Sequence, residues 1–291
     1  TAAGVPAGVF NLVNGDGPVV GHAIASHPDV AMVSITGSTR AGILVAQAAA
    51  PTVKRVCQEL GGKSANIIFP DADLEAAAKW NIARGCANTG QSCHSPTRIL
   101  VQRQQVEQVT KALAAEAAKI VVGDPTDPAT TMGPLVNRQQ YERVTSYIRK
   151  GLGEGARLVC GGPERPPGLT AVFYVQPTVF ADVTQDMTIA REEIFGPVLA
   201  VLAYDTEEEA IRMANDSVYG LGAYVFTTDA VKARRVTSQL PAGRVFVNGA
   251  DTNPAAPMGG YKQSGNGREM GVFGLEEYLE VKAIFGLAEA A

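Results

Sequence analysis

Apolar residues recur at intervals of three and four in several stretches of the chain, which is the spacing of one face of a helix. The clearest stretches have the apolar positions Val106, Val109, Leu113, Ala117 and Ile120, then Tyr141, Val144 and Ile148, then Ala233, Val236 and Leu240. We expect Asp229 to cap the last of these helices and Pro241 to end it. Residues Thr206 to Glu209 have the pattern of a capping box, which predicts one more helix start.

The first part of the chain alternates between strand-like and helix-like segments. We predict a strand over Gly8–Val13, a helix over Val19–Ser26, a strand over Val30–Thr36, a helix over Ser38–Ala50 and a strand over Val53–Leu60. Such an alternation favours a parallel sheet that is covered by helices.

A second α/β region begins after Gly61-Gly62. It opens with a predicted strand over Ala65–Phe69, and Asp71 and Asp73 offer caps for a helix that runs toward Arg84. Near the end of the region, Arg244–Asn248 is predicted as a strand. The tail, Tyr278–Phe285, alternates apolar and polar residues, so we expect a strand there that joins another sheet.

Composition narrows the possible classes of function. The 291 residues are 46% hydrophobic and 19% charged with a net charge of −4, which indicates a globular protein without the basic surface that nucleic acid or an acidic membrane surface would need. No apolar run reaches the length of a membrane span. The chain opens on Thr1 rather than Met, so we expect truncation, processing or a split subunit.

Four cysteines and three histidines show no metal-ligand spacing, and we predict no metal site. So few cysteines also argue against a disulfide scaffold and favour a reducing cytoplasm as the location. We interpret Cys57, Cys86 and Cys160 as small core residues.

Cys93 differs from the other cysteines because its setting, Gly90-Gln91-Ser92-Cys93, is polar and would keep the thiol approachable. Upstream, Glu59 opens Glu59-Leu60-Gly61-Gly62-Lys63 at the carboxyl end of a predicted strand, where open α/β sheets bind ligands. A bare glutamate before two glycines is otherwise most often a surface charge. A thiol and a carboxylate together can form a thioester and then hydrolyse it.

Two further segments bear on a nucleotide site, the first through its own residues and the second only through the family resemblance described below. Gly37, Ser38 and Gly42 lie where a strand turns into a helix, and the free N–H groups there suit a pyrophosphate. The alternative is an ordinary turn with Ser38 as the helix cap. In Glu192-Glu193-Ile194-Phe195-Gly196-Pro197, Glu193 can accept two hydroxyls, whereas Phe195 on its own would be assigned to the core.

With these motifs the chain resembles the C-terminal three-fifths, roughly, of NAD(P)-dependent aldehyde dehydrogenases, from about Ala3 to Phe285. The resemblance implies that an aldehyde is oxidised to a carboxylic acid through a thiohemiacetal and a thioester on Cys93, with Glu59 as the base that activates water. It implies NAD as the cofactor, with NADP left open. Gly37, Ser38 and Gly42 would lie on its phosphate side, the Leu60 carbonyl near the nicotinamide, Glu193 on the ribose and Phe195 beside the ring.

The same resemblance assigns Ser92, His94, Thr252 and Met258 to the mouth of a substrate tunnel. Relatives commonly carry Phe where this chain has Met258, so the mouth is not expected to be an aromatic box. Because neighbouring side chains usually diverge, we do not expect a Cys93–His94 dyad.

The implied fold is α/β, with a Rossmann-like parallel sheet and a three-layer α/β/α catalytic domain. Residues 1–61 would be the C-terminal part of the dinucleotide-binding domain, 62–263 the catalytic domain, and 264–291 a segment with an oligomerisation strand, as in homodimers or homotetramers of the family. The family's first strands, its residues for the adenosine ribose and its oxyanion-hole asparagine lie upstream of Thr1. We therefore expect this chain alone to bind the cofactor poorly.

Two alternatives to an aldehyde-oxidising enzyme stay open. One is an inactive core or assembly fragment of such an enzyme. The other is a CoA-acylating aldehyde dehydrogenase, which Glu59 disfavours because a base that activates water is of little use there. The sequence does not name the aldehyde.

Overall fold

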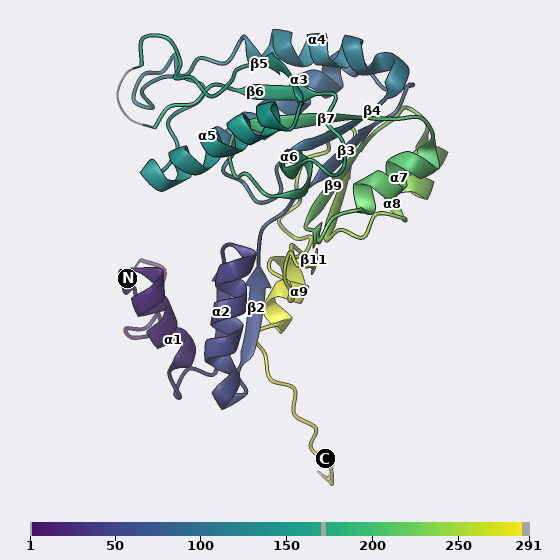
Figure 1. The fold of residues 1–291 in the computed structure, drawn as a ribbon. Helices are drawn as coiled ribbons and strands as arrows, with labels where there is room; N and C mark the ends of the chain where they lie inside the picture. Colours follow the sequence, from purple (N-terminus) through teal and green to yellow (C-terminus); the bar gives the residue numbers. More distant parts are fainter. Residues whose placement is uncertain (1, 170–172, 287–291) are drawn as a thin grey trace.

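Two sheets of unequal size organise the chain in the computed structural model, which describes residues 2–169 and 173–286 (Figure 1). The small sheet has two parallel strands, β1 (Met32–Thr36) and β2 (Arg55–Glu59), in register from Met32 opposite Arg55 to Thr36 opposite Glu59. Helix α2 (Thr39–Ala49) packs beside both strands, and α1 (His22–Ser26) lies against α2. We call this part, with the short helix α9 (Gly271–Glu276), the small lobe.

The large lobe is built on a seven-stranded sheet with the order β10-β9-β3-β4-β7-β6-β5. All of its strand pairs are parallel except β5 with β6. The strands are β3 (Ala65–Ile68), β4 (Arg98–Gln102), β5 (Arg157–Cys160), β6 (Thr178–Ala181), β7 (Val198–Tyr204), β9 (Gly222–Phe226) and β10 (Arg244–Val247).

Helices cover both faces of the large sheet. The face toward α3 and α4 buries Ile82 and Leu113, and the opposite face buries Ile148 of α5 and Val236 of α8. The expected three-layer α/β/α fold is therefore confirmed. The large-lobe helices are α3 (Leu74–Cys86), α4 (Val106–Ala117), α5 (Arg138–Gly153), α6 (Thr188–Arg191), α7 (Glu207–Asn215) and α8 (Ala230–Thr237).

The predicted caps are present except Asp71, whose carboxylate accepts the N–H groups of Thr228 and Asp229 instead of capping α3. Ser38, Asp73 and Asp229 each accept backbone N–H groups at the start of α2, α3 and α8. Thr206 accepts the N–H of Glu209, but the Glu209 carboxylate returns to the N–H of Asp205, so the box closes one residue earlier than its usual form.

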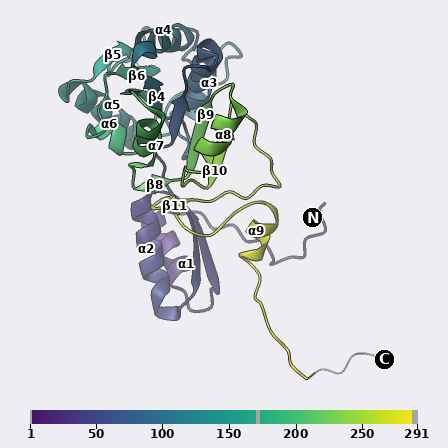
Figure 2. The ribbon, with the colours of Figure 1, turned by 90° about the vertical axis from the view of Figure 1, so that its right-hand side faces the viewer.

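One predicted strand is wrong for this chain. Gly8–Val13 forms turns, and its apolar side chains, such as Phe10, are exposed because no neighbouring strand or helix covers them. The strand expected over Tyr278–Phe285 forms no strand pair with any described segment of this chain, and Val281 is fully exposed, so its joining a sheet of another subunit stays a prediction. Figure 2 shows this segment leaving the small lobe as a single extended trace.

The two lobes are tied together by a short antiparallel pair, β8 (Tyr219–Gly220) with β11 (Tyr261–Lys262). Ser264 then donates its hydroxyl to the Gly61 carbonyl and accepts the N–H of Gly220. The link between the lobes is thus fixed at the same place where the chain passes from β2 to β3.

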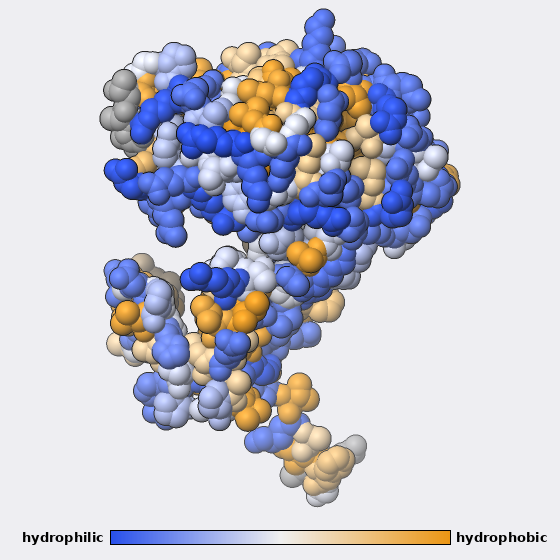
Figure 3. All heavy atoms as spheres, viewed as in Figure 1, coloured by the Kyte–Doolittle hydropathy of each residue, from blue (hydrophilic) through white to orange (hydrophobic). Residues whose placement is uncertain are grey.

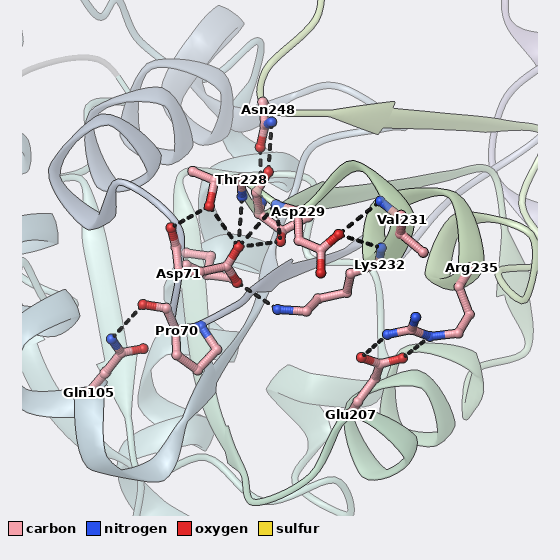
Figure 4. A network of polar contacts seen from close by, with 12 residues as sticks. Pro70, Asp71, Gln105, Glu207, Thr228, Asp229, Val231, Lys232, Arg235 and Asn248 are labelled. Carbon is pink, nitrogen blue, oxygen red and sulfur yellow. Dashed lines mark hydrogen bonds and ion pairs between the residues drawn. The ribbon is translucent and has the colours of Figure 1, made fainter.

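Within the large lobe, Asp71 joins the turn after β3 to the turn after β9 (Figure 4). Its carboxylate accepts the hydroxyl of Thr227 at 2.6 Å and the N–H of Thr228 at 2.8 Å, and it pairs with Lys232 at 2.8 Å. Partial burial works to raise the pKa of Asp71, but these bonds outweigh it and hold the pKa well below its usual range. We call this group the Asp71 clamp.

Among the described residues, no helix is long and apolar enough to cross a membrane.

Candidate active site

The loop before Cys93 has an unusual backbone. Asn88, Thr89 and Gly90 follow α3 with φ angles of 51°, 57° and 69°, in the left-handed region. A methyl group at position 90 would lie 2.2 Å from the Gly196 carbonyl carbon, so only glycine lets this loop pack on the Glu193–Pro197 segment. Cys93 is thereby held beside that segment.

Gly62 brings the carboxylate loop to the nucleophile loop. A methyl group at position 62 would lie 2.3 Å from the Cys93 carbonyl oxygen. Glu59, at the carboxyl end of β2, and Cys93 consequently open into one cleft of about 690 Å³ between α2 and α5, which we call the central cleft. The predicted site residues that line it are Gly37, Ser38, Glu59, Ser92, Cys93, His94, Glu193, Phe195 and Met258.

Glu59 is 2% exposed, and neither of its carboxylate oxygens has a hydrogen-bond partner among the described residues. Burial raises its pKa to about 7, with a smaller contribution from Glu269, while Arg268 and Arg244 oppose the shift. A carboxylate that is half protonated near neutral pH and free of partners is suited to take a proton from water.

The Cys93 thiol is half-buried. Burial raises its pKa, and the carboxylates of Glu193 and Glu59 add to the effect. His94 does not diverge as expected, because its Nδ1 lies 3.9 Å from Cys93 Sγ and 3.3 Å from Ser92 Oγ. Burial, Arg84 and Arg244 lower the pKa of His94, so its imidazole is neutral and is a poor partner for a resting thiolate.

Glu193 and Phe195 line the same cleft as Gly37. The Glu193 carboxylate accepts the N–H of Gly62 at 3.0 Å; burial raises its pKa, and that N–H together with Lys63 opposes the shift. Phe195 is a non-glycine residue with a φ of 61°, so its ring is aimed by a strained backbone.

Three predicted site residues do not line the central cleft. Gly42 lies under Leu60, whose side chain would be 2.6 Å from a methyl group at position 42, so this glycine serves packing. Leu60 is buried, and Thr252 lies in the exposed loop of residues 250–256. Ser38 lines the cleft, but its hydroxyl also accepts the N–H of Ala41, as in the alternative of an ordinary capped turn.

Sequence reasoning missed several charged and polar groups around the cleft. Gln140 donates to the carbonyls of Ile194 and Phe195, and Arg143 donates to the carbonyl of Glu193, so α5 holds this wall in place. The helical period of α5 had been interpreted only through its apolar face. No residue spacing signalled that its polar face would meet a loop far along the chain.

Lys63 is a further residue whose buried environment the sequence did not indicate. It is 2% exposed, its Nζ has no hydrogen-bond partner among the described residues, and burial together with Arg98 lowers its pKa to about 7. The described part of the chain contains no group of His, Cys, Asp or Glu that could hold a metal ion.

Comparison with known proteins decides the family. Residues 1–284 match the profile of the Aldehyde dehydrogenase family. The chain belongs to this family.

Individual aldehyde dehydrogenases agree with the assignment. A 3-succinoylsemialdehyde-pyridine dehydrogenase of a Pseudomonas species is 56% identical over 97% of this chain and 59% of its own length. The aldehyde dehydrogenase AldC of Pseudomonas syringae, solved as a cysteine-to-alanine mutant with NAD+ and octanal, is 57% identical with a TM-score of 0.97 over 100% of this chain and 60% of its own. The NAD+ complex of a Bacillus cereus aldehyde dehydrogenase is 47% identical with a TM-score of 0.93 over 97% of this chain and 57% of its own.

The chain thus spans about 60% of the length of the aldehyde dehydrogenases that it matches. The resemblance to the aldehyde dehydrogenase family, over about three-fifths of its members' length, is confirmed.

Proposed function

We propose that this chain supplies the nucleophile, the base and part of the cofactor site for oxidation of an aldehyde to a carboxylic acid with NAD+. The observation that carries the proposal is the shared cleft: in a member of this family, the Cys93 thiol and the unpartnered Glu59 carboxylate open into one space. This cleft is not seen from either motif alone.

The residues of the chain divide the chemistry into two stages. The Cys93 sulfur, once deprotonated, adds to the aldehyde carbon and forms a thiohemiacetal, and loss of hydride from that carbon leaves a thioester on Cys93. Glu59 then takes a proton from water, whose oxygen attacks the thioester and releases the acid with the Cys93 thiol. Hydrolysis should therefore accelerate as the pH rises through about 7, the pKa of Glu59.

The cleft fits a dinucleotide. Its walls hold a strand-to-helix turn at Gly37 and Ser38, a carboxylate at Glu193 and an aromatic ring at Phe195, and its volume of about 690 Å³ lies in the range of cofactor sites. When bound, NAD+ supplies the acceptor for the hydride. Gly37 and Ser38 would hold the pyrophosphate, Glu193 the ribose hydroxyls, and Phe195 would limit the swing of the ring.

The proposal includes a partner segment. The relatives are longer than this chain, which covers about 60% of them, and the small sheet formed by the described residues has two strands; we propose that a further segment, upstream in the complete protein, belongs to this lobe. Full activity is expected only when a segment of that kind completes the small lobe, in a homodimer or homotetramer of the completed protein.

Intact mass spectrometry tests the proposal. The chain, mixed with the upstream segment of the Pseudomonas syringae relative, is given octanal and NAD+. We expect turnover, an octanoyl adduct that accumulates in Glu59→Gln, and no adduct in Cys93→Ala. Cys160→Ala and Glu192→Gln are the matched controls and should behave as the parent.

Three outcomes would count against the proposal. An adduct that persists in Cys93→Ala would remove the nucleophile. Steady turnover in Glu59→Gln would remove the base, and release of the acyl group only after addition of CoA would indicate the CoA-acylating class instead. If the mixture forms a stable complex and neither turnover nor adduct is seen, the chain is an inactive core fragment.

A further inference from the structure

A second, smaller pocket lies behind His94. It has a volume of about 190 Å³ and shares Gln91, Ser92 and His94 with the central cleft, and Arg84 and Ser95 line it but not the central cleft. A water molecule occupies roughly 30 Å³ of liquid, so the pocket has room for about six waters or a short organic group. We call it the side pocket.

Two polar groups that line the side pocket, the Ser95 hydroxyl and the Arg84 guanidinium, have no hydrogen-bond partner among the described residues, whereas Asn88, Gln91, Ser92 and Tyr224 have theirs. Ser95 is 5% exposed, and its hydroxyl is buried with no hydrogen-bond partner among the described residues. Arg84, in the last turn of α3, forms no ion pair with any carboxylate of the described residues, and no Asp or Glu lines the pocket. A buried hydroxyl without a partner costs free energy, which a ligand acceptor would recover.

Arg84 is exposed, and an aromatic ring lies beside its guanidinium. The guanidinium carbon of Arg84 lies 6.0 Å from the centre of the Trp80 ring, and Trp80 in turn packs on Tyr224 at 5.0 Å between ring centres. Tyr224 donates its hydroxyl to the His94 carbonyl at 2.6 Å, so the same aromatic group supports the Arg84 side and the nucleophile side of the pocket. A guanidinium with free donors binds a carboxylate through two parallel hydrogen bonds.

We propose that the side pocket binds the distal carboxylate of an ω-carboxy aldehyde, with Arg84 and the Ser95 hydroxyl as its donors, while the aldehyde end reaches Cys93. The proposal rests on the proposed function for the aldehyde end alone. The carboxylate site needs no reaction at Cys93.

The chain contains its own reporter, because Trp80 is its one tryptophan. The intact chain is titrated with glutarate, an unreactive dicarboxylate, and with glutaramide, its neutral counterpart, while Trp80 fluorescence is followed. We expect a saturable change with glutarate, little change with glutaramide, and the same response in Cys93→Ala.

Variants then assign the donors. Arg84→Gln should weaken glutarate binding at least about tenfold, the loss of a charge-assisted pair. Arg84→Lys should be intermediate, and Ser95→Ala should weaken binding by a smaller factor. Arg235→Gln, which breaks an ion pair with Glu207 on the large lobe, is the control and should bind as the parent. Urea unfolding of each variant shows that the fold is kept.

The kinetic test in the mixture with the upstream segment separates this proposal from the proposed function. Arg84→Gln should raise KM for glutarate semialdehyde about tenfold without changing kcat, and octanal kinetics should stay the same. No saturable response to glutarate, or an equal response in Arg84→Gln, would overturn the side-pocket proposal. Glutarate binding that is intact while no aldehyde is oxidised would overturn the proposed function and leave this one standing.

Discussion

We call the large lobe closed, because helices cover both faces of its sheet, and the small lobe open, because part of its apolar surface is uncovered. In the large lobe, β4 and β7 have almost no exposed side chains, because helices cover both faces of their sheet. In the small lobe, Ile43 and Leu44 of α2 are more than half exposed, and apolar surface is visible there and along the C-terminal segment (Figure 3). The chain therefore contains one lobe with a complete core and one that lacks part of its cover.

The chemistry lies where the two lobes meet. Cys93 comes from the closed lobe, whereas Gly37 and Glu59 come from the open one. The position of Cys93 is therefore fixed by a lobe whose core is complete in this chain. The positions of Glu59 and of the proposed pyrophosphate site at Gly37 depend on the small lobe, which has few core contacts. The predictions below test this division.

The largest effect is expected in the closed core. Leu100 of β4 is fully buried, and Leu100→Ala should lower the free energy of unfolding by about 2–5 kcal/mol. Leu44→Ala, at a half-exposed position of α2, should cost less than about 0.5 kcal/mol. Urea unfolding measures both. Equal costs would mean that α2 is covered in solution and that the contrast between the lobes is wrong.

At the junction, Gly62→Ala should cost about 1–3 kcal/mol because the new methyl group would meet the Cys93 carbonyl. It should also slow alkylation of Cys93, which intact mass spectrometry follows with iodoacetamide. Gly153→Ala is the matched control: its methyl group would meet nothing within 4 Å at the end of α5, and its stability should be unchanged or slightly higher. An unaffected Gly62→Ala would show that the lobes do not need this contact.

Because of Lys63, which lies where the two lobes join, the free energy of unfolding should depend on pH. The pKa of Lys63 is lowered from 10.5 to about 7 in the folded chain, so between these values the unfolded chain binds a proton that the folded chain lacks. The free energy of unfolding should therefore rise with pH by up to about 1.4 kcal/mol per unit from pH 7 to about pH 8.5, and Lys63→Met should remove this rise. Urea unfolding of the parent and of Lys63→Met at several pH values across that range tests this prediction. Lys79→Met is the control, because Lys79 is an exposed lysine. A slope that survives in Lys63→Met would place its source elsewhere.

The smallest effect is expected in the open lobe. Arg55 of β2 pairs with Glu280 at 3.0 Å, and both side chains are exposed, so Arg55→Gln should cost less than about 1 kcal/mol. The same change should speed proteolysis of the C-terminal segment, which this pair holds beside β2. Arg235→Gln in the large lobe should leave that cleavage unchanged, and the reverse pattern would refute the contact.

The sequence predicted best where the pattern is local. The helices of Val109 and Val144 were found because each has an apolar face at helical spacing, and Asp73 and Asp229 cap as expected. The strand predicted over Gly8–Val13 failed because a run of apolar residues says nothing about whether a partner covers it. Strands such as β7, a continuous apolar run, carry no alternation and were not predicted.

The sequence predicted which residues form the candidate site, but not their burial, their hydrogen-bond partners or their pKa values. Motifs named Cys93 and Glu59, yet the unpartnered state of Glu59 and its raised pKa depend on β2 ending inside the protein. The polar face of α5 and the pocket behind His94 depend on contacts between segments far apart in sequence. Such contacts cannot be obtained from spacing.

The Asp71 clamp can form only late in synthesis, because its partners lie far along the chain. Strand β3 sits between β4, which follows it closely, and β9, which is made only after most of the chain. Until Thr227 and Lys232 leave the ribosome, Asp71 has no partner and one edge of β3 stays unpaired. While the residues between β4 and β9 are being made, that edge of β3 is therefore open to wrong pairing, which favours misassembly.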